Sequence, residues 1–209
     1  MIIAIDGPAA AGKGTLARKL AAHYGLNYLD TGALYRATGM AVLRSGGDPA
    51  DPIAAETAAR QLDPQGLSDP ALRGEEAGDA ASKVAAIPAV RAALLDFQRT
   101  YAERPPGAVL DGRDIGTVVC PGAEVKLFVT ASLEKRAERR LKELLDKGVS
   151  AIGERILQEM KDRDARDSAR SVAPLVPAAD AVLLDTSELD ADAAFAAAVQ
   201  IISQRRPAD

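Results

Sequence analysis

A glycine-rich segment near the start of the chain limits the fold more than any other feature. It follows the apolar run Ile2–Ile5 and precedes a helical stretch with leucines on one face, as phosphate-binding loops do. Glycines let backbone N–H groups converge on phosphate oxygens, and the helix directs its positive end at the same anion. The loop residues expected to hold ATP are Gly7, Pro8, Ala9, Ala10, Ala11, Gly12, Lys13, Gly14 and Thr15.

Two side chains of this loop carry its chemistry. Lys13 can reach the β- and γ-phosphates of a nucleotide. Gly14 occupies the position where Ser or Thr is usual, and Thr15 follows it, so the Thr15 hydroxyl is the expected ligand of Mg²⁺. The alternative is a glycine-rich turn that carries a solvated lysine, and it is disfavoured because the motif and its strand-to-helix context agree.

The loop predicts binding of a nucleoside triphosphate without identifying the reaction. A GTPase should carry an Asn-Lys-x-Asp motif, which the sequence lacks, and motor or transporter ATPases are usually longer than 209 residues. A small-molecule kinase fits better. The alternatives left open are a kinase for adenylate, shikimate or a cofactor precursor, and a nucleotide-dependent switch without turnover.

Composition excludes several classes of protein. The single cysteine, Cys120, rules out an intrachain disulfide and a cysteine zinc cluster, and the single histidine, His23, removes most Ser-His-Asp and multi-histidine sites. A net charge of -4 and 3% aromatic residues disfavour nucleic-acid binding. The sequence shows neither a signal peptide nor a run of about 18 apolar residues. We therefore expect a cytoplasmic protein with no nucleic-acid or membrane partner.

Apolar runs alternate with helical stretches along the chain, which predicts an α/β fold with a parallel sheet between layers of helices. Strands are expected at Ile2–Ile5, Asn27–Leu29, Ala108–Leu110, Glu124–Val129 and Ala181–Leu184. Helices are expected at Lys13–Tyr24, Ala33–Arg44, Glu75–Tyr101 with a break or new start at Pro88, Ser132–Lys147, Ile152–Arg170 and Ala191–Gln204.

The pattern changes between Asp48 and Leu72. Several aspartates and the prolines Pro49, Pro52, Pro64 and Pro70 interrupt the helical periodicity there. We expect a mobile inserted subdomain in this region.

Two further motifs have both a structural and a functional interpretation. The segment Asp30–Arg36 either caps a helix or places Arg36, one turn in, against an acceptor phosphate. The segment Leu110–Thr117 follows an apolar strand, at the end of the sheet where open α/β folds bind ligands. There Arg113 offers a planar fork for phosphate and Asp114 an acceptor for an amine, unless the segment is only a surface turn.

A third motif concentrates arginine. Arg163, Arg166 and Arg170 are spaced to share one face of a helix, where three guanidinium groups repel each other unless something neutralises them. Neighbouring carboxylates could do so, which would make the stripe a solvated face. The alternative is a polyphosphate that these arginines meet during a catalytic cycle.

The chain resembles the bacterial cytidylate kinases, which belong to the nucleoside monophosphate (NMP) kinases. The resemblance is collinear and spans nearly the whole chain. The segments that carry it are Ile3–Pro8, Gly12–Thr15, Asp30–Arg36, Ala81–Ala85, Val90-Arg91, Asp111–Val119, Arg163–Asp167 and Val172–Leu175.

The resemblance implies a three-layer P-loop kinase fold in one domain. A core (about 1–36, 85–147 and 171–209) would carry an NMP-binding insert (about 37–84) and a helical lid (about 148–170). The stretch between Arg36 and Ser82 is shorter than in long members of the family, so the insert is expected to be trimmed.

The resemblance also implies a reaction and a site. The γ-phosphoryl group of ATP would pass to CMP or dCMP, giving CDP or dCDP and ADP, in pyrimidine nucleotide metabolism. Mg²⁺ would be the cofactor. The protein would be a monomer. The implied catalytic residues are Lys13, Arg113, Arg163, Arg166 and Arg170, and Arg136 and Arg140 would approach ATP. The implied CMP-binding residues are Thr31, Tyr35, Arg36, Ser82, Arg91, Asp111, Gly112, Arg113, Asp114, Arg163, Asp167 and Arg170.

Overall fold

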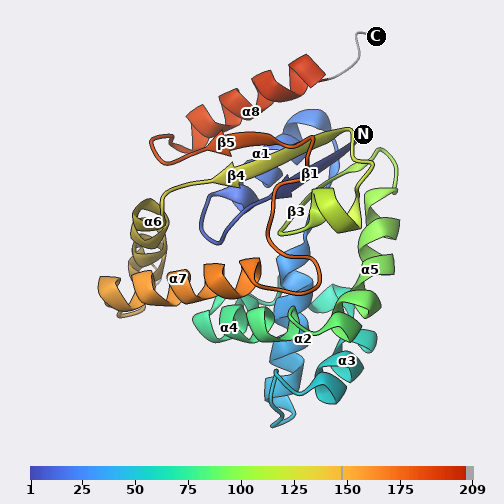
Figure 1. Cartoon of the computed structure of the whole chain (residues 1–209), viewed down its shortest axis with the longest axis vertical. Coiled ribbons are helices and arrows are strands. Elements are labelled where there is room, and N and C mark those ends of the chain that lie inside the picture. Colours follow the sequence, from blue (N-terminus) through green and yellow to red (C-terminus); the bar gives the residue numbers. More distant parts are fainter. Residues whose placement is uncertain (147, 206–209) are drawn as a thin grey trace.

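A parallel sheet forms the centre of the computed structural model, which describes residues 1–146 and 148–205. Its five strands run in the order β2-β3-β1-β4-β5 (Figure 1). Their bounds are β1 Ile2–Asp6, β2 Asn27–Asp30, β3 Ala108–Gly112, β4 Val125–Thr130 and β5 Val182–Asp185. The predicted parallel α/β sheet is confirmed, with strand ends that differ by a residue or two from the sequence-based expectation.

Alternation along β1 explains how the sheet is buried on both faces. Ile3 and Ile5 pack with α1 (Lys13–Tyr24) and α8 (Ala191–Arg205), whereas Ala4 faces the cluster beside α5 (Pro88–Ala102). Successive strand side chains point to opposite faces, so each face acquires its own apolar layer. The two layers hold β1 in the middle of the sheet, and its carboxyl end leads directly into the phosphate loop.

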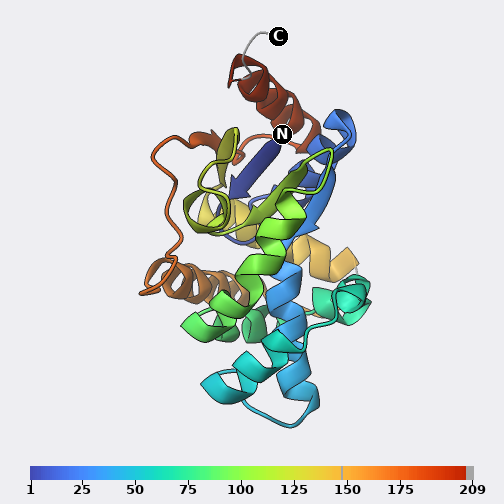
Figure 2. The ribbon, with the colours of Figure 1, turned by 90° about the vertical axis from the view of Figure 1, so that its right-hand side faces the viewer.

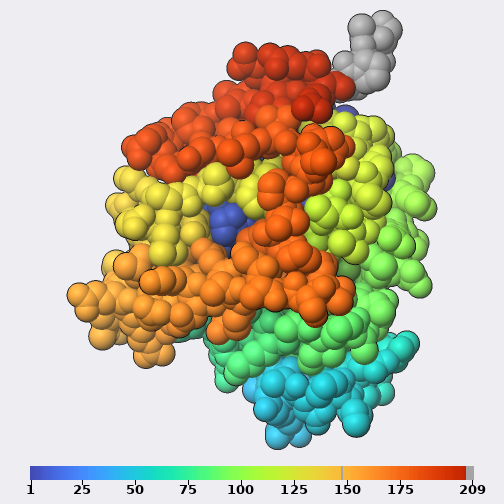
Figure 3. Space-filling view, in the orientation of Figure 1, coloured from blue at the N-terminus to red at the C-terminus, as the bar shows by residue number. Residues whose placement is uncertain are grey.

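The register of β1 and β3 brings two motifs together. Ile5 pairs with Asp111 and Asp6 with Gly112, so the phosphate loop and the segment after β3 leave the same edge of the sheet side by side. This is the edge where parallel sheets bind ligands. Figure 3 shows the N-terminal segment, in blue, at the bottom of a hollow framed by the chain around α6 and α7.

A second apolar cluster lies away from the sheet, in the region where the insert is expected. It joins the buried faces of α2 (Thr31–Arg44), α3 (Pro52–Arg60), α4 (Glu75–Val84) and the start of α5, in the lower half of Figures 1 and 2. Helices α2 and α4 approach closely because Gly39 has no side chain: a Cβ there would lie 2.7 Å from the Cβ of Ala80.

Three of the four prolines between Asp48 and Leu72 begin elements rather than break them. Asp51 caps α3 with Pro52 in its first turn, and the same Asp-Pro pattern begins the short 3₁₀ turns Pro64–Ser68 and Pro70–Arg73. Proline is compatible with a first helical turn because its missing N–H would have had no partner there. The expectation that these prolines interrupt helical structure is therefore wrong for Pro52, which begins α3.

Two expected helices differ at their ends. Glu75–Tyr101 divides into α4 and α5, and Pro88 takes the first turn of α5, one of the two outcomes expected for it. Helix α6 covers Leu133–Asp146, and the predicted end at Lys147 lies outside the described residues. Helix α7 covers Gly153–Ser168 and packs against α6 (Figure 1).

The arginine stripe is not confined to one helix. Arg163 and Arg166 lie on α7, but Arg170 follows its end, so the expectation that all three share one helical face is wrong. The Leu175 N–H donates to the Asp167 carbonyl oxygen at 2.9 Å, where the chain turns back on itself.

Within the described residues, no helix is long and apolar enough to span a bilayer.

Substituting Gly39 tests how tightly α2 and α4 pack. Gly39→Ala should destabilise the protein by about 1–3 kcal/mol, because the added Cβ meets α4 below contact distance. Gly66→Ala is the matched control: its Cβ would meet no atom within 4 Å, and its effect should stay within about 0.5 kcal/mol. Urea unfolding measures both, and equal midpoints for the two variants would contradict the close α2–α4 contact.

Candidate active site

The phosphate loop depends on glycines at two positions. Gly7 has φ +145°, and a Cβ there would lie 1.9 Å from the Val129 carbonyl oxygen of the neighbouring strand. Gly12 precedes α1 in a left-handed conformation with φ +87°, which non-glycine residues rarely adopt. The chain therefore turns sharply from β1 into α1, with the N-terminal end of α1 facing the hollow.

Lys13 is buried at the start of α1 and has a low proton affinity. Its ammonium group donates to the Pro8 carbonyl oxygen at 2.7 Å. Burial lowers its pKa to about 7, and the positive charges of Arg113 and Arg163 add to the effect. A buried ammonium group among guanidinium groups is stabilised by an incoming anion, which supplies the missing negative charge.

A cavity of about 230 Å³ opens beside Lys13 and collects residues from distant parts of the sequence. All residues that the resemblance assigns to CMP line it, namely Thr31, Tyr35, Arg36, Ser82, Arg91, Asp111, Gly112, Arg113, Asp114, Arg163, Asp167 and Arg170. Ala9, Ala10 and Lys13 of the phosphate loop also line it. The structure thus brings the expected residues together.

The start of α2 forms one side of this cavity. The Asp30 carboxylate caps α2 by accepting from the Ala33 N–H at 3.2 Å, and its other oxygen pairs with Arg36 at 2.6 Å. Thr31 Oγ1 donates to the Asp111 carbonyl oxygen at 2.7 Å and ties α2 to the end of β3. The segment therefore both caps a helix and presents Arg36 to the cavity.

An ion pair forms the opposite end of the cavity. Arg91 on α5 and Asp114 after β3 are both buried and hydrogen-bonded to each other, and Arg91 also donates to the Ala85 carbonyl oxygen at 3.2 Å. The Arg91 guanidinium lies 5.4 Å from the centre of the Tyr35 ring. The pair therefore places hydrogen-bond donors and acceptors side by side on a part of the cavity wall that is nearly inaccessible to water.

Asp167 connects α7 to the sheet. Its carboxylate accepts from Arg113 Nε at 3.0 Å and also pairs with Arg170, and its side chain is 1% exposed. Burial opposes ionisation of Asp167, but the charges of Arg113 and Arg170 outweigh that effect and lower its pKa. One carboxylate therefore orients two guanidinium groups toward the cavity.

Three guanidinium groups around the cavity have a buried N–H without a partner among the described residues. The unpaired atoms are the Nε atoms of Arg36, Arg163 and Arg170. Burial lowers the pKa of Arg163 to about 10, helped by the charge of Arg113. Unpaired buried donors are costly and rare, so the site is suited to an anion that satisfies them.

The Asp111 carboxylate near the loop has a raised proton affinity. Burial raises the pKa of Asp111 to about 6, and the negative charge of Asp30 adds to it. Asp111 Oδ2 lies beside the first turn of α1, 3.4 Å from where a Cβ on Gly14 would be. Among the described residues no cluster of three His, Cys, Asp or Glu side chains could hold a metal.

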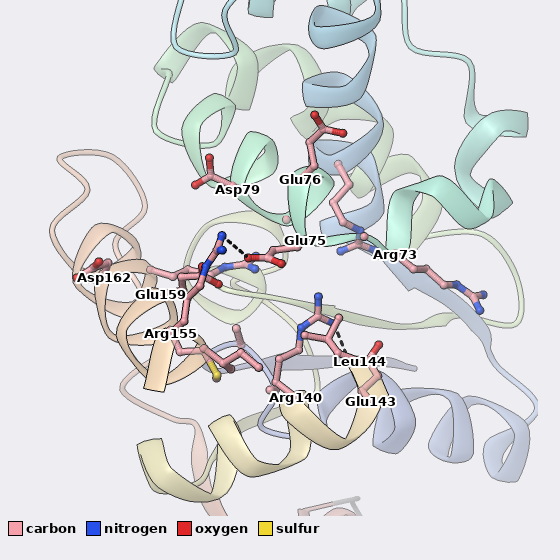
Figure 4. A pocket seen from close by; sticks show the side chains of 18 of the residues that line it. Arg73, Glu75, Glu76, Asp79, Arg140, Glu143, Leu144, Arg155, Glu159 and Asp162 are labelled. Carbon is pink, nitrogen blue, oxygen red and sulfur yellow. Dashed lines mark hydrogen bonds and ion pairs between the residues drawn. The ribbon is translucent and has the colours of Figure 1, made fainter. Parts of the chain in front are cut away.

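A larger cavity of about 830 Å³ adjoins the first, between α4, α6 and α7 (Figure 4). The two cavities share Ala9, Ala10, Arg36 and Arg163, so they meet at the tip of the phosphate loop. Arg166 lines only the larger cavity, which Arg36 and Arg163 also line, whereas Arg113 and Arg170 line only the smaller one.

The two arginines of α6 that are expected to approach ATP differ in how many hydrogen bonds hold them. Arg136 is buried and donates to the Asp164 carboxylate at 2.7 and 3.2 Å, to the Ala131 carbonyl oxygen at 2.9 Å and to the Ala9 carbonyl oxygen at 3.3 Å. It therefore ties α7 and the phosphate loop to α6. Arg140 lines the larger cavity, where it pairs with Glu143.

Sequence reasoning missed Asp6. Its carboxylate accepts from the N–H groups of Ile115 and Gly116, both at 2.7 Å, and holds the π-helical turn that follows Asp114. Burial raises the pKa of Asp6 to about 6. A carboxylate directly after a buried apolar strand is the signal that could have indicated this role.

Comparisons with known proteins agree with this geometry. The cytidylate kinase family model matches residues 3–204. Cytidylate kinases of Paramagnetospirillum magneticum and Rhodospirillum rubrum are 68% and 61% identical, each covering 98% of this chain and 99% and 98% of their own lengths.

Solved structures with low sequence identity share the fold. TT1252 from Thermus thermophilus aligns over 100% of this chain and 98% of its own with TM-score 0.51 and 20% identity. An uncharacterized protein from Eubacterium ventriosum aligns over 97% and 98% with TM-score 0.57 and 16% identity. Together with the phosphate loop and the parallel sheet, the family match and the full-length relatives establish that this chain is a kinase of the cytidylate kinase family.

Proposed function

We propose that this protein transfers the γ-phosphoryl group of ATP to CMP and dCMP, giving CDP or dCDP and ADP, in pyrimidine nucleotide metabolism. The observation that carries the proposal is the set of unpaired buried N–H groups of Arg36, Arg163 and Arg170 around a cavity beside Lys13. An acceptor phosphate in the smaller cavity would satisfy these donors and would lie next to the phosphate loop.

The donor nucleotide is assigned to the phosphate loop, residues 7–15. The N-terminal end of α1 and the buried Lys13 both favour a polyphosphate at the tip of the loop, where the two cavities meet. Donor and acceptor phosphates would then approach each other from opposite sides of Arg163. We assign Lys13, Arg113, Arg163 and Arg170 to charge stabilisation, with Arg166 joining them from the lid.

The acceptor base is assigned to the end of the cavity formed by Ser82, Arg91 and Asp114. Cytosine presents an amine donor beside two acceptors, and a carboxylate beside a guanidinium and a hydroxyl complements that edge. Uracil presents an acceptor and an N–H donor at those positions, so it would face Asp114 with a lone pair.

Mg²⁺ fits the residues near the first turn of α1. Asp111 supplies a carboxylate there, one of the hard oxygen donors that this ion prefers, whereas Thr15 is exposed, lines neither cavity and is assigned as a ligand from the sequence alone. The ion needs few protein ligands, since substrate phosphates and waters complete its shell. Bound with ATP, it would neutralise developing charge on the β- and γ-phosphates.

The protein's own contribution is position and charge. Phosphoryl transfer has a loose transition state, so a catalyst must align the two nucleotides and stabilise charge on the transferring group. The arginines do this without histidine or cysteine, and residues 148–170 would close over the reacting groups and exclude water. The cavities are built within one chain, and we expect a monomer in the cytoplasm.

The choice of acceptor is the direct test of this function. A coupled assay of ADP release should give kcat/KM for CMP and dCMP at least about a hundredfold above that for UMP, AMP and shikimate. Equal turnover of CMP and UMP at low acceptor concentration would contradict the assigned base site. Absence of ADP release with every monophosphate would support a switch without turnover instead.

The low pKa of Lys13 predicts pH-dependent ATP binding. Above pH 7 the free protein loses the Lys13 proton, and a bound polyphosphate must restore it, so affinity should fall with rising pH by up to about tenfold per unit. Titration calorimetry with a non-hydrolysable ATP analogue between about pH 7.5 and 9 measures the slope. Lys13→Arg keeps its charge and should show a flat profile, whereas parallel profiles would contradict the assignment.

Replacing Arg163 and replacing Arg136 should have different effects on the stability of the protein. Arg163→Met should lower kcat/KM at least about a hundredfold while leaving the melting temperature unchanged or higher, because the guanidinium is buried and under-paired without substrate. Arg136→Met should destabilise the protein by about 3 kcal/mol, because it leaves Asp164 and two carbonyl oxygens without their donor. Thermal melts and kinetics of both variants measure this, and strong destabilisation by Arg163→Met would contradict it.

A further inference from the structure

Helices α4 and α7 meet along a polar seam. The residues of α4 on this seam are spaced to share one face, and so are those of α7. They are Glu75, Gly78, Asp79 and Ser82 on α4, and Arg155, Glu159, Arg163 and Arg166 on α7. Arg155 approaches Glu75 at 3.8 Å across the larger cavity, as the dashed line in Figure 4 shows.

Helix α7 comes close to α4 at the end of the seam that includes Gly78 and Arg163. Gly78 leaves room for Arg163, whose Nη1 lies 3.2 Å from where a Cβ on Gly78 would be. One turn further on, Arg166 uses two donors in two directions: Nη2 pairs with Asp79 Oδ1 at 3.1 Å, and Nε donates to Ser82 Oγ at 3.2 Å. Because a guanidinium is planar and its N–H directions are fixed, the contact with Asp79 sets the direction of the donor to Ser82.

The contact with Arg166 has a consequence for the Ser82 hydroxyl. A serine hydroxyl can donate one hydrogen and can accept through its lone pairs. When Arg166 donates to Ser82 Oγ, the hydroxyl hydrogen must point away from the guanidinium. Ser82 is buried and lines the smaller cavity, whereas Asp79 and Arg166 line the larger one, so the chain of contacts passes from one cavity to the other.

We propose that Asp79 and Arg166 form a relay that makes Ser82 a hydrogen-bond donor toward the acceptor base, so that docking of the lid contributes to the choice of base. The inference rests on the proposed function, because it assigns the base to the smaller cavity. Asp79 touches no substrate and acts as a positioning residue.

The relay discriminates at one ring atom. Cytosine carries an acceptor at N3, which a donor from Ser82 satisfies. Uracil carries an N–H at the same position, so a hydroxyl with its hydrogen directed there meets a second donor. Without the relay the hydroxyl can rotate and accept from uracil, and the discrimination at this atom is lost.

The test compares base selectivity in variants of Asp79. Asp79→Ala should lower the ratio of kcat/KM for CMP over UMP about three- to tenfold, the effect of one hydrogen bond. The value of kcat for CMP should remain within about twofold of the wild type. Asp79→Asn keeps an acceptor for Arg166 and should retain most of the selectivity. The ratio does not depend on the fraction of folded enzyme, so a loss of stability cannot imitate the effect.

Two controls separate the relay from other effects of the substitution. Asp79 also pairs with Lys83 at 3.0 Å, and Lys83→Ala removes that pair while keeping Asp79 beside Arg166. Glu76→Gln removes another carboxylate from the wall of the larger cavity. Both variants should keep the wild-type ratio, and a lowered ratio in Lys83→Ala would overturn the relay.

A double-mutant cycle tests whether Asp79 acts through Ser82. In a Ser82→Ala background, Asp79→Ala should have no further effect on the CMP/UMP ratio, and full additivity would overturn the proposal. A wild-type ratio near one would instead contradict the proposed base site. A high wild-type ratio that Asp79→Ala leaves unchanged would contradict the relay alone.

Discussion

The carboxylate of Asp167 is the interaction on which the site depends. It lies at the end of α7, almost inaccessible to solvent, and holds Arg113 from the sheet and Arg170 from the segment after the helix. Breaking such a buried pair would leave uncompensated charge, so the carboxylate fixes both guanidinium groups and anchors α7 over the sheet at once. The other buried cations, Lys13 and Arg163, are arranged around this centre with less compensation.

Incomplete compensation of positive charge makes the smaller cavity suited to an anion. Burial lowers the pKa of Lys13 and of Arg163, and unpaired guanidinium N–H groups face inward. These groups cost stability in the free protein, and a polyphosphate would restore the missing negative charge. The net charge of -4 says nothing of this, because it averages over a chain whose cations converge on one place.

Much of the fold could be predicted because it depends on local patterns. Apolar runs predicted the strands, helical periodicity predicted most helices, and the glycines around Lys13 indicated the sharp turn between β1 and α1. Helix α3 was missed because the prolines were interpreted as breaks, although an aspartate directly before Pro52 forms an N-terminal cap. The end of α7 was misjudged because the arginine spacing continues past the residue where the chain turns back.

The sequence by itself determined the phosphate loop, the alternation of strands and helices, and the set of residues that line the smaller cavity, because these follow from short motifs and the family resemblance. Only the tertiary structure decided which side chains form hydrogen bonds with each other. The Asp6 carboxylate binds the turn after Asp114, although the two are more than a hundred residues apart in the sequence. Arg166 on α7 likewise contacts Ser82 and Asp79 on α4. Such contacts join segments that are distant in the chain, and a pattern confined to neighbouring residues contains no information about which side chains meet in space.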